Sequence, residues 1–164
     1  MSRKPVIAVV GTGQHSEPAV SNGRELGRLI AEQGWVLISG GRDGGVMKAA
    51  NEGAKLESGS LTIGILPNGD TEIAAGVDVA IITNTGEARN NIIVLSADVV
   101  IACGVDDPGT ASEVSLALKA GKPVIVIGAD YPAREFFTKI GGEAIQFVDS
   151  PSAAIQTARM LPGT

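Results

Sequence analysis

The stretch that decides the fold runs from Gly86 to Gly128 and reads GEARNNIIVLSADVVIACGVDDPGTASEVSLALKAGKPVIVIG. Two β-branched apolar runs, Val99–Ala102 and Pro123–Ile127, flank a segment from about Thr110 to Lys119 whose apolar residues stand three and four apart. The short runs are typical of buried strands, and the spacing between them predicts a helix. The stretch is therefore a strand–helix–strand unit, which places two parallel strands in one sheet.

The same alternation extends from this unit toward both ends of the chain. Further strands are expected at Val6–Val10, Trp35–Ser39, Leu61–Leu66, Val79–Ile82 and Ile145–Val148. Helices are expected over a stretch that carries Leu26, Leu29 and Ile30 and ends at Gly34, over Val46–Leu56 and Ala88–Ser96, and from Ser150-Pro151 onward. Pro67–Gly76 reads as a long irregular connection. Because runs such as IAVV, VVIA and VIVI are apolar on both faces, we expect an α/β fold: a Rossmann-like, doubly wound, mostly parallel sheet with helices on both faces.

Length and composition predict one domain over residues 1–164, without a linker or an internal repeat. The chain has 44% hydrophobic residues and 18 acidic against 13 basic side chains, for a formal charge of -5. This charge makes nucleic acid and membrane surfaces poor partners.

One cysteine and one histidine exclude an intramolecular disulfide and a Cys- or multi-His-based metal cage, and no metal site is predicted. Cys103 is expected to be a small buried hydrophobe, and His15 either a surface loop residue or a phosphate contact.

No apolar run approaches the length of a membrane span, and the first ten residues do not form a signal peptide. We therefore expect a cytoplasmic protein.

Ligands of doubly wound sheets bind at the carboxyl ends of the strands, where this sequence places four turns: Gly11–Ser16, Gly40–Gly45, Thr83–Arg89 and Cys103–Thr110. The first turn lacks the third glycine of a dinucleotide fingerprint, and the second strand ends in Ser39 rather than in a ribose-binding acid, so NAD is disfavoured. No GxxxxGK[ST] motif is present, which removes the P-loop NTPases. The glycine turns remain candidates for binding anions through backbone N–H groups, although each could simply be a tight turn.

Two arginines stand at this edge of the predicted sheet. Arg42 lies inside the second glycine turn, and Arg89 lies at a helix start beside Asn90. A guanidinium fork matches phosphate oxygens, so both are candidates for holding a phosphate. The alternatives are a solvated turn arginine for Arg42 and a structural ion pair with Glu87 or Glu113 for Arg89.

Three acids belong to the turn and helix after Val99–Ala102. Glu113 follows Gly109-Thr110 in the first helical turn, where a carboxylate either caps backbone N–H groups or faces a ligand's sugar or an attacking water. Asp106 and Asp107 precede it and could cap the helix or take a cation.

The ordered set of turns resembles a known superfamily. GWVLISGGRDGGVMKAANEGAK at residues 34–55, LTIGILPNGDT at residues 61–71 and the Gly86–Gly128 stretch are similar to the superfamily of the LOG-type cytokinin-activating phosphoribohydrolases, often called lysine decarboxylases, and the molybdenum cofactor carrier proteins. The similarity runs from Val6 to about Phe137 and is closest to the carrier branch.

Three differences from the phosphoribohydrolase pattern support the placement in the carrier branch. Arg42 follows Gly40-Gly41 where those enzymes continue in glycine, and Arg89-Asn90-Asn91 replaces their Arg-Lys pair. Their Pro-Gly-Gly-x-Gly-Thr motif reads Asp106-Asp107-Pro108-Gly109-Thr110 here, with Glu113 kept downstream. The loss of two glycines from the turn that would seat sugar and water speaks against hydrolysis.

As a carrier, the resemblance implies a non-enzyme that binds the molybdenum cofactor (molybdopterin), with its terminal phosphate on the helix start at Gly109-Thr110. The expected binding residues are Gly11, Thr12, Gly13, Gly40, Gly41, Arg42, Gly44, Gly45, Arg89, Asn90, Gly109, Thr110 and Glu113. It also implies recipient molybdoenzymes as partners, and homodimers or homotetramers. The apolar segments Ile92–Leu95 and Val114–Leu118 predict such assembly, because they carry more apolar side chains than one sheet face readily covers.

The alternative that the resemblance implies is a phosphoribohydrolase that cleaves the N-glycosidic bond of a nucleoside 5′-monophosphate. In that case Arg89 would hold the substrate and Glu113 would assist water. A nucleotide-binding sensor with neither role is a third possibility.

Overall fold

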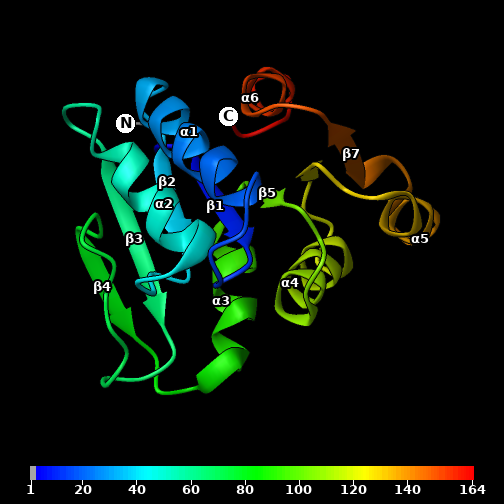
Figure 1. Cartoon of the computed structure of the whole chain (residues 1–164). Helices are drawn as coiled ribbons and strands as arrows, with labels where there is room; N and C mark the ends of the chain where they lie inside the picture. The colour runs from blue at the N-terminus through cyan, green and yellow to red at the C-terminus, as the bar shows by residue number, and fades with distance from the viewer. Residues whose placement is uncertain (1–2) are drawn as a thin grey trace.

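All seven strands of the sheet run parallel in the computed structural model, which describes residues 3–164. Their order is β4-β3-β2-β1-β5-β6-β7. The strands are β1 (Val6–Gly11), β2 (Val36–Ser39), β3 (Leu61–Leu66), β4 (Val79–Ile82), β5 (Val99–Cys103), β6 (Val124–Ile127) and β7 (Ile145–Val148). The predicted Rossmann-like α/β fold is confirmed, with a sheet that is entirely rather than mostly parallel (Figure 1).

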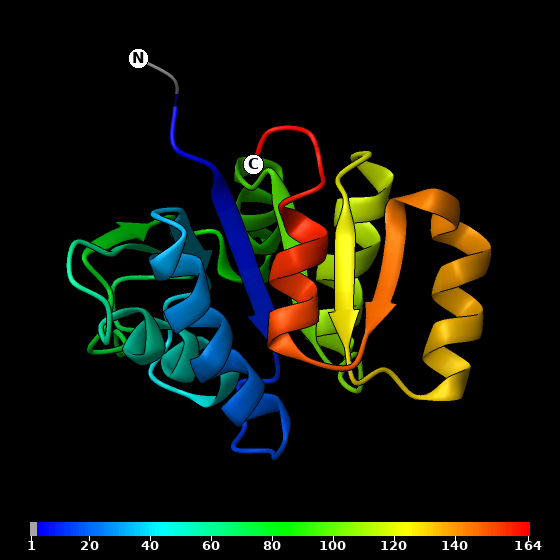
Figure 2. The same cartoon turned by 90° about the horizontal axis from the view of Figure 1, so that it is seen from above.

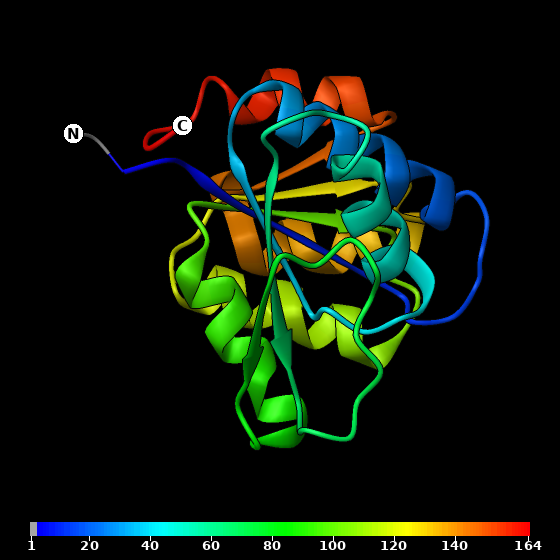
Figure 3. The same ribbon diagram turned by 90° about the vertical axis from the view of Figure 1, so that its left-hand side faces the viewer.

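Helices cover both faces of the sheet, as the apolar strands require. They are α1 (Ala19–Glu32), α2 (Gly45–Ala54), α3 (Arg89–Ser96), α4 (Pro108–Lys119), α5 (Tyr131–Gly141) and α6 (Pro151–Ala158). Alternate residues of β1 enter two separate cores: Ile7 and Val9 pack with residues of α1, α2 and α6, while Ala8 and Val10 pack with residues of α3, α4 and α5. Figure 3 shows α1, α2 and α6 above the sheet and α3 and α4 below it.

The chain reverses its direction of travel across the sheet between β1 and β5. From β1 it builds outward through β2 and β3 to β4, then returns to pair β5 beside β1 and builds outward to β7. The arrowheads of β1, β6 and β7 point the same way in Figure 2. A crevice is therefore expected where the loops after β1 and β5 diverge, at the carboxyl edge of the sheet.

Helices α1 and α2 approach each other through glycines. A Cβ added to Gly27 of α1 would overlap the carbonyl oxygen of Ala50, and one added to Gly53 of α2 would overlap that of Arg24. The helix backbones are thus in direct contact, with no space for side chains between them at these points. This contact fixes the position of α2, whose first residue, Gly45, is the last residue of the second glycine turn.

Helix α5 lies between Ile127 and Ile145, where the periodicity of the sequence predicts no element. Asp130 begins this helix by accepting a hydrogen bond from the Ala133 backbone N–H at 2.9 Å, with a proline in the first turn. Helix α4 starts at Pro108, two residues earlier than predicted, and a short 3-10 turn at Gly86–Ala88 precedes α3.

The apolar residues of α3 and α4 are better covered than expected. Ile93, Val94, Val114 and Ala117 are fully buried against the sheet, because the buried residues of each helix lie on one stripe that faces it. Of the residues expected on a surface patch, Ile92 and Leu95 are the large apolar side chains that remain well exposed.

Among residues 3–164, none of the helices has both the length and the apolar character that crossing a membrane requires.

Candidate functional site

The carboxyl edge of the sheet holds a small pocket of about 110 Å³ that gathers residues from four separate turns. Eight of the predicted binding residues line it: Gly11, Gly13, Arg42, Arg89, Asn90, Gly109, Thr110 and Glu113. Met47, Glu87 and Asp107 complete the lining. The topology brings these turns together because β1, β2 and β5 are adjacent parallel strands that end at the same edge.

Three of the predicted glycines do not line the pocket but pack behind the residues that do. A Cβ on Gly40 would lie 2.6 Å from Sδ of Met47 and 3.3 Å from Nη2 of Arg89. Because Gly40 has no side chain, the side chains of Met47 and Arg89 can pack directly against its backbone. Gly41 has a φ of +67° and stands against Gly64 of β3. Gly45, with a φ of +50°, packs on the carbonyl oxygen of Thr12.

Arg89 is the cation at the floor of the pocket. The residue is only 3% exposed, and its Nε is buried without a hydrogen-bond acceptor. Nη1 donates to the Asn90 side-chain oxygen and, at 3.3 Å, to Oε2 of Glu87. The ion pair with Glu87 that the sequence left open is present, yet it leaves one buried donor of the guanidinium without a partner. A buried N–H without an acceptor is costly, so this group is poised to take an anion.

Arg42 is half-exposed at the rim. Its Nη1 lies 3.7 Å from Oε1 of Glu87, and its backbone forms an isolated antiparallel bridge with Ile73. Glu87 therefore stands between both arginines, with its own side chain 69% exposed. An exposed carboxylate held at such distances contributes little to stability and can yield to a better anion.

Asp107, not Glu113, caps α4. Its Oδ1 accepts the Thr110 backbone N–H at 3.0 Å, and its Oδ2 accepts the Thr110 hydroxyl at 2.6 Å. Of the two roles that the sequence allowed for Asp107, the cap is the one present. The cap also occupies the backbone N–H and the hydroxyl of Thr110, one of the two residues on which the resemblance places a phosphate.

Glu113 is nearly buried, at 8% exposure, and lies one helical turn beyond Thr110. Burial raises the pKa of its carboxyl to about 8; the negative charges of Asp107 and Glu87 raise this pKa further, and Arg89 opposes them. At neutral pH the group is therefore largely a neutral acid beside a guanidinium.

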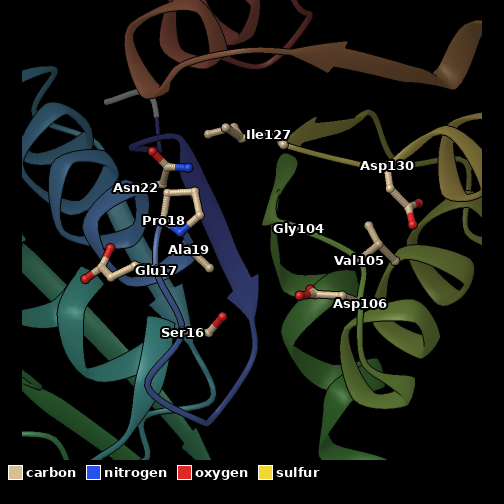
Figure 4. Close-up of a pocket in the computed structure, with 11 residues that line it drawn as sticks. Ser16, Glu17, Pro18, Ala19, Asn22, Gly104, Val105, Asp106, Ile127 and Asp130 are labelled. Carbon is tan, nitrogen blue, oxygen red and sulfur yellow. The ribbon is translucent and has the colours of Figure 1, made fainter.

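Two larger hollows adjoin the pocket and share lining residues with it. One, of about 510 Å³, is lined by Gly13, Gln14, Arg42, Asp43, Gly44, Met47, Thr71 and Glu72. The other, of about 440 Å³, is lined by Thr12, Gly13, Gln14, Ser16, Asp106, Asp107 and Pro108. A further cavity of about 300 Å³ adjoins it at the start of α1 (Figure 4). The predicted residues Thr12 and Gly44 thus lie along the crevice, next to the pocket.

Several lining residues were not foreseen from the sequence. The sequence pattern predicts Met47 only as part of a helical apolar stripe, and Glu87 only as a possible partner of Arg89. His15 is exposed beside Glu17 and lines none of these hollows. Cys103 is buried as predicted, and burial raises the pKa of its thiol to about 12. Within residues 3–164, no group of three or more His, Cys, Asp and Glu side chains is placed to hold a metal ion.

Comparison with known proteins gives concordant matches. The model of the SLOG cluster4 family matches residues 4–155. The molybdenum cofactor binding protein of Rippkaea orientalis is 46% identical, with a TM-score of 0.92 over 97% of this chain and 98% of that one. The molybdenum cofactor carrier protein of Chlamydomonas reinhardtii is 43% identical, with a TM-score of 0.92 over 99% and 100% of the two chains. A protein of Archaeoglobus fulgidus is 45% identical over 118 residues, which span 72% of this chain and 76% of that one.

Proposed function

The chain belongs to the SLOG cluster4 family, and from this premise we propose that it binds the molybdenum cofactor and acts as its carrier. The similar structures from Rippkaea orientalis and Chlamydomonas reinhardtii, which cover nearly the whole chain, support the ligand class. The proposal includes delivery to molybdoenzymes and a cytoplasmic location, both of which stay predictions.

The observation that carries the proposal is the buried guanidinium of Arg89 with its unpartnered Nε. A pocket of about 110 Å³ around it suits a compact anion such as a phosphate, whereas the adjoining hollow of about 440 Å³ and the cavity of about 300 Å³ next to it leave room for a ring system. The crevice therefore fits a ligand that joins a terminal phosphate to a larger heterocycle. Arg42 at the rim supplies a second guanidinium for the same phosphate.

The residues of the site favour binding of a ligand over cleavage of a bond in it. A general base or an oxocarbenium-stabilising group must carry negative charge, but burial keeps the Glu113 carboxyl largely protonated near pH 7. The Thr110 donors that could fix a sugar phosphate are already taken by Asp107. Both features disfavour Glu113 as a base and Thr110 as a phosphate anchor, and so support a carrier without a bond-breaking step.

Calorimetric titration with molybdopterin or its metal-loaded form tests the binding. Arg89→Lys keeps the charge but loses the fork, and Arg42→Ala removes the rim contact; each is expected to weaken binding roughly ten- to a hundredfold. Arg24→Ala, which removes an exposed arginine from α1, is the control and should bind like the wild type. Unchanged affinity in both site variants would refute this placement of the phosphate.

Incubation with AMP at multiple turnovers tests the assignment as a carrier. We expect no adenine or ribose 5-phosphate above background by chromatography. Release of both products, lost in Glu113→Gln, would make the protein a phosphoribohydrolase instead.

A further inference from the structure

Four carboxylates stand along the outer part of the crevice, and three of them are engaged in the fold. Glu17 accepts the Ser21 backbone N–H at 3.2 Å, Asp107 caps α4, and Asp130 caps α5. Asp106 makes no hydrogen bond and no ion pair with any residue from 3 to 164. It is one of the two acids that replace glycines of the related enzymes, and the cap explains only the other one.

The backbone presents Asp106 to the crevice. Gly104 adopts a φ of +78°, and a Cβ there would lie 2.8 Å from Oδ1 of Asp106, so the carboxylate rests directly over this glycine. Figure 4 shows the Asp106 side chain directed toward the gap that separates the loop after β5 from the loop before α1, with Ser16 on the opposite side. The carboxylate of Glu17 points away from that gap.

The cavity next to Asp106 has an apolar component that a bare cation site would not need. It measures about 300 Å³, and Val105, Ile127 and Pro18 are among its lining residues. Apolar surface of this kind suits the face of a flat heterocycle.

This cavity and the Arg89 pocket both adjoin the hollow of about 440 Å³. Ser16 and Asp106 line both the cavity and the hollow of about 440 Å³, and Gly13 and Asp107 line both that hollow and the pocket around Arg89. The crevice thus has a buried guanidinium with an unpartnered N–H at one end and, at the other, an exposed carboxylate that is free to bind a ligand. A ligand that spans it has an anion at one end and hydrogen-bond donors at the other.

Resting on the proposed function, we propose that Asp106 is the residue that recognises the pterin ring, by accepting hydrogen bonds from its amino group and the adjacent ring N–H. These two donors lie side by side on one edge of the ring and match the two oxygens of a carboxylate, as a guanidinium fork does. The ring face then lies on the apolar lining, and the terminal phosphate reaches Arg89. Asp106 acts as a specificity-determining residue that distinguishes pterins from heterocycles without this donor edge.

A pair of probes and a pair of variants test the assignment. The probes are a 6-substituted pterin with a terminal phosphate and its lumazine counterpart, in which oxygen replaces the amino group. By fluorescence titration, Asp106→Asn should lose roughly ten- to a hundredfold in affinity for the pterin and much less for the lumazine. Glu17→Gln removes the same charge from the same cavity and should bind both probes like the wild type.

The outcomes separate this assignment from the function on which it rests. If the wild type binds neither the pterin probe nor the cofactor, the proposed function fails. If the wild type binds but Asp106→Asn binds equally well, or if Glu17→Gln loses as much, then the role of Asp106 is refuted while the carrier function stands. Inorganic phosphate should compete equally in the wild type and in Asp106→Asn, since its contact is with Arg89.

Discussion

At the scale of single residues, Glu113 is the group whose protonation couples the site to pH. Its folded-state pKa of about 8 lies above the value of 4.5 for an ordinary glutamate, because the burial that positions it beside Arg89 disfavours the carboxylate. A group with a raised folded-state pKa stabilises the protein fully below its unfolded-state pKa. That contribution is lost as pH rises from about 4.5 to about 8.

We therefore expect the free energy of unfolding of the wild type to fall across this window relative to that of Glu113→Gln, which cannot ionise. The difference between the two proteins should change by at most about 1.4 kcal/mol per pH unit and level off above pH 8 to 9. Urea unfolding of both proteins at pH 5, 6.5, 8 and 9 measures it. Parallel stability profiles would show that Glu113 titrates normally.

At the scale of elements, the contact between α1 and α2 determines where the second glycine turn lies. Ala is normally favoured over Gly inside a helix by about 1 kcal/mol. At Gly27 the sign reverses, because the new Cβ would overlap the Ala50 carbonyl oxygen and would force the helices apart. Gly27→Ala should destabilise the protein by about 1–3 kcal/mol, measured by urea unfolding.

Gly69→Ala is the matched control. This glycine has no atom within 4 Å of an added Cβ and no positive φ, so the substitution should be neutral or stabilising by up to about 1 kcal/mol. A Gly27→Ala protein as stable as the wild type would mean that α1 and α2 can separate without cost.

The period of the apolar residues predicted the strands and most helices, because each buried strand here is a short β-branched run. It missed α5, although Asp130 and Pro132 form the same type of helix start as Ser150-Pro151, which was recognised. Spacing alone could not rank Asp106, Asp107 and Glu113 as caps, since that depends on which carboxylate reaches the Thr110 N–H. The burial of Arg89 also depends on Gly40, which lies 49 positions away along the chain.

At the scale of the whole molecule, one surface still carries uncovered apolar side chains. Ile92 and Leu95 of α3 are 39% and 49% exposed, beside a hollow between α3 and α4 lined in part by Ala88, Leu116 and Ala120. A second copy of the chain would cover such a surface, and a symmetric pair is the usual arrangement.

We expect a mass by light scattering of at least twice the 16.6 kDa of one chain at micromolar concentration. The double substitution Ile92→Lys and Leu95→Lys should give monomers with an unchanged far-UV circular dichroism spectrum, because both side chains lie outside the core. A wild type that elutes and scatters as a monomer would contradict the prediction.

The point where the chain changes direction has a kinetic consequence. The two halves of the sheet meet along the β1–β5 ladder, from Ile7 opposite Val99 to Gly11 opposite Cys103, and the proposed ligand would touch loops from both halves at the end of that seam. A ligand bound there would hold the two halves of the sheet together. The β1–β5 ladder could then open locally only after the ligand has left. Backbone amides of β1 and β5 near the seam should then exchange their hydrogens more slowly in the loaded protein, and the rate of cargo release would set an upper limit on how fast the seam can open.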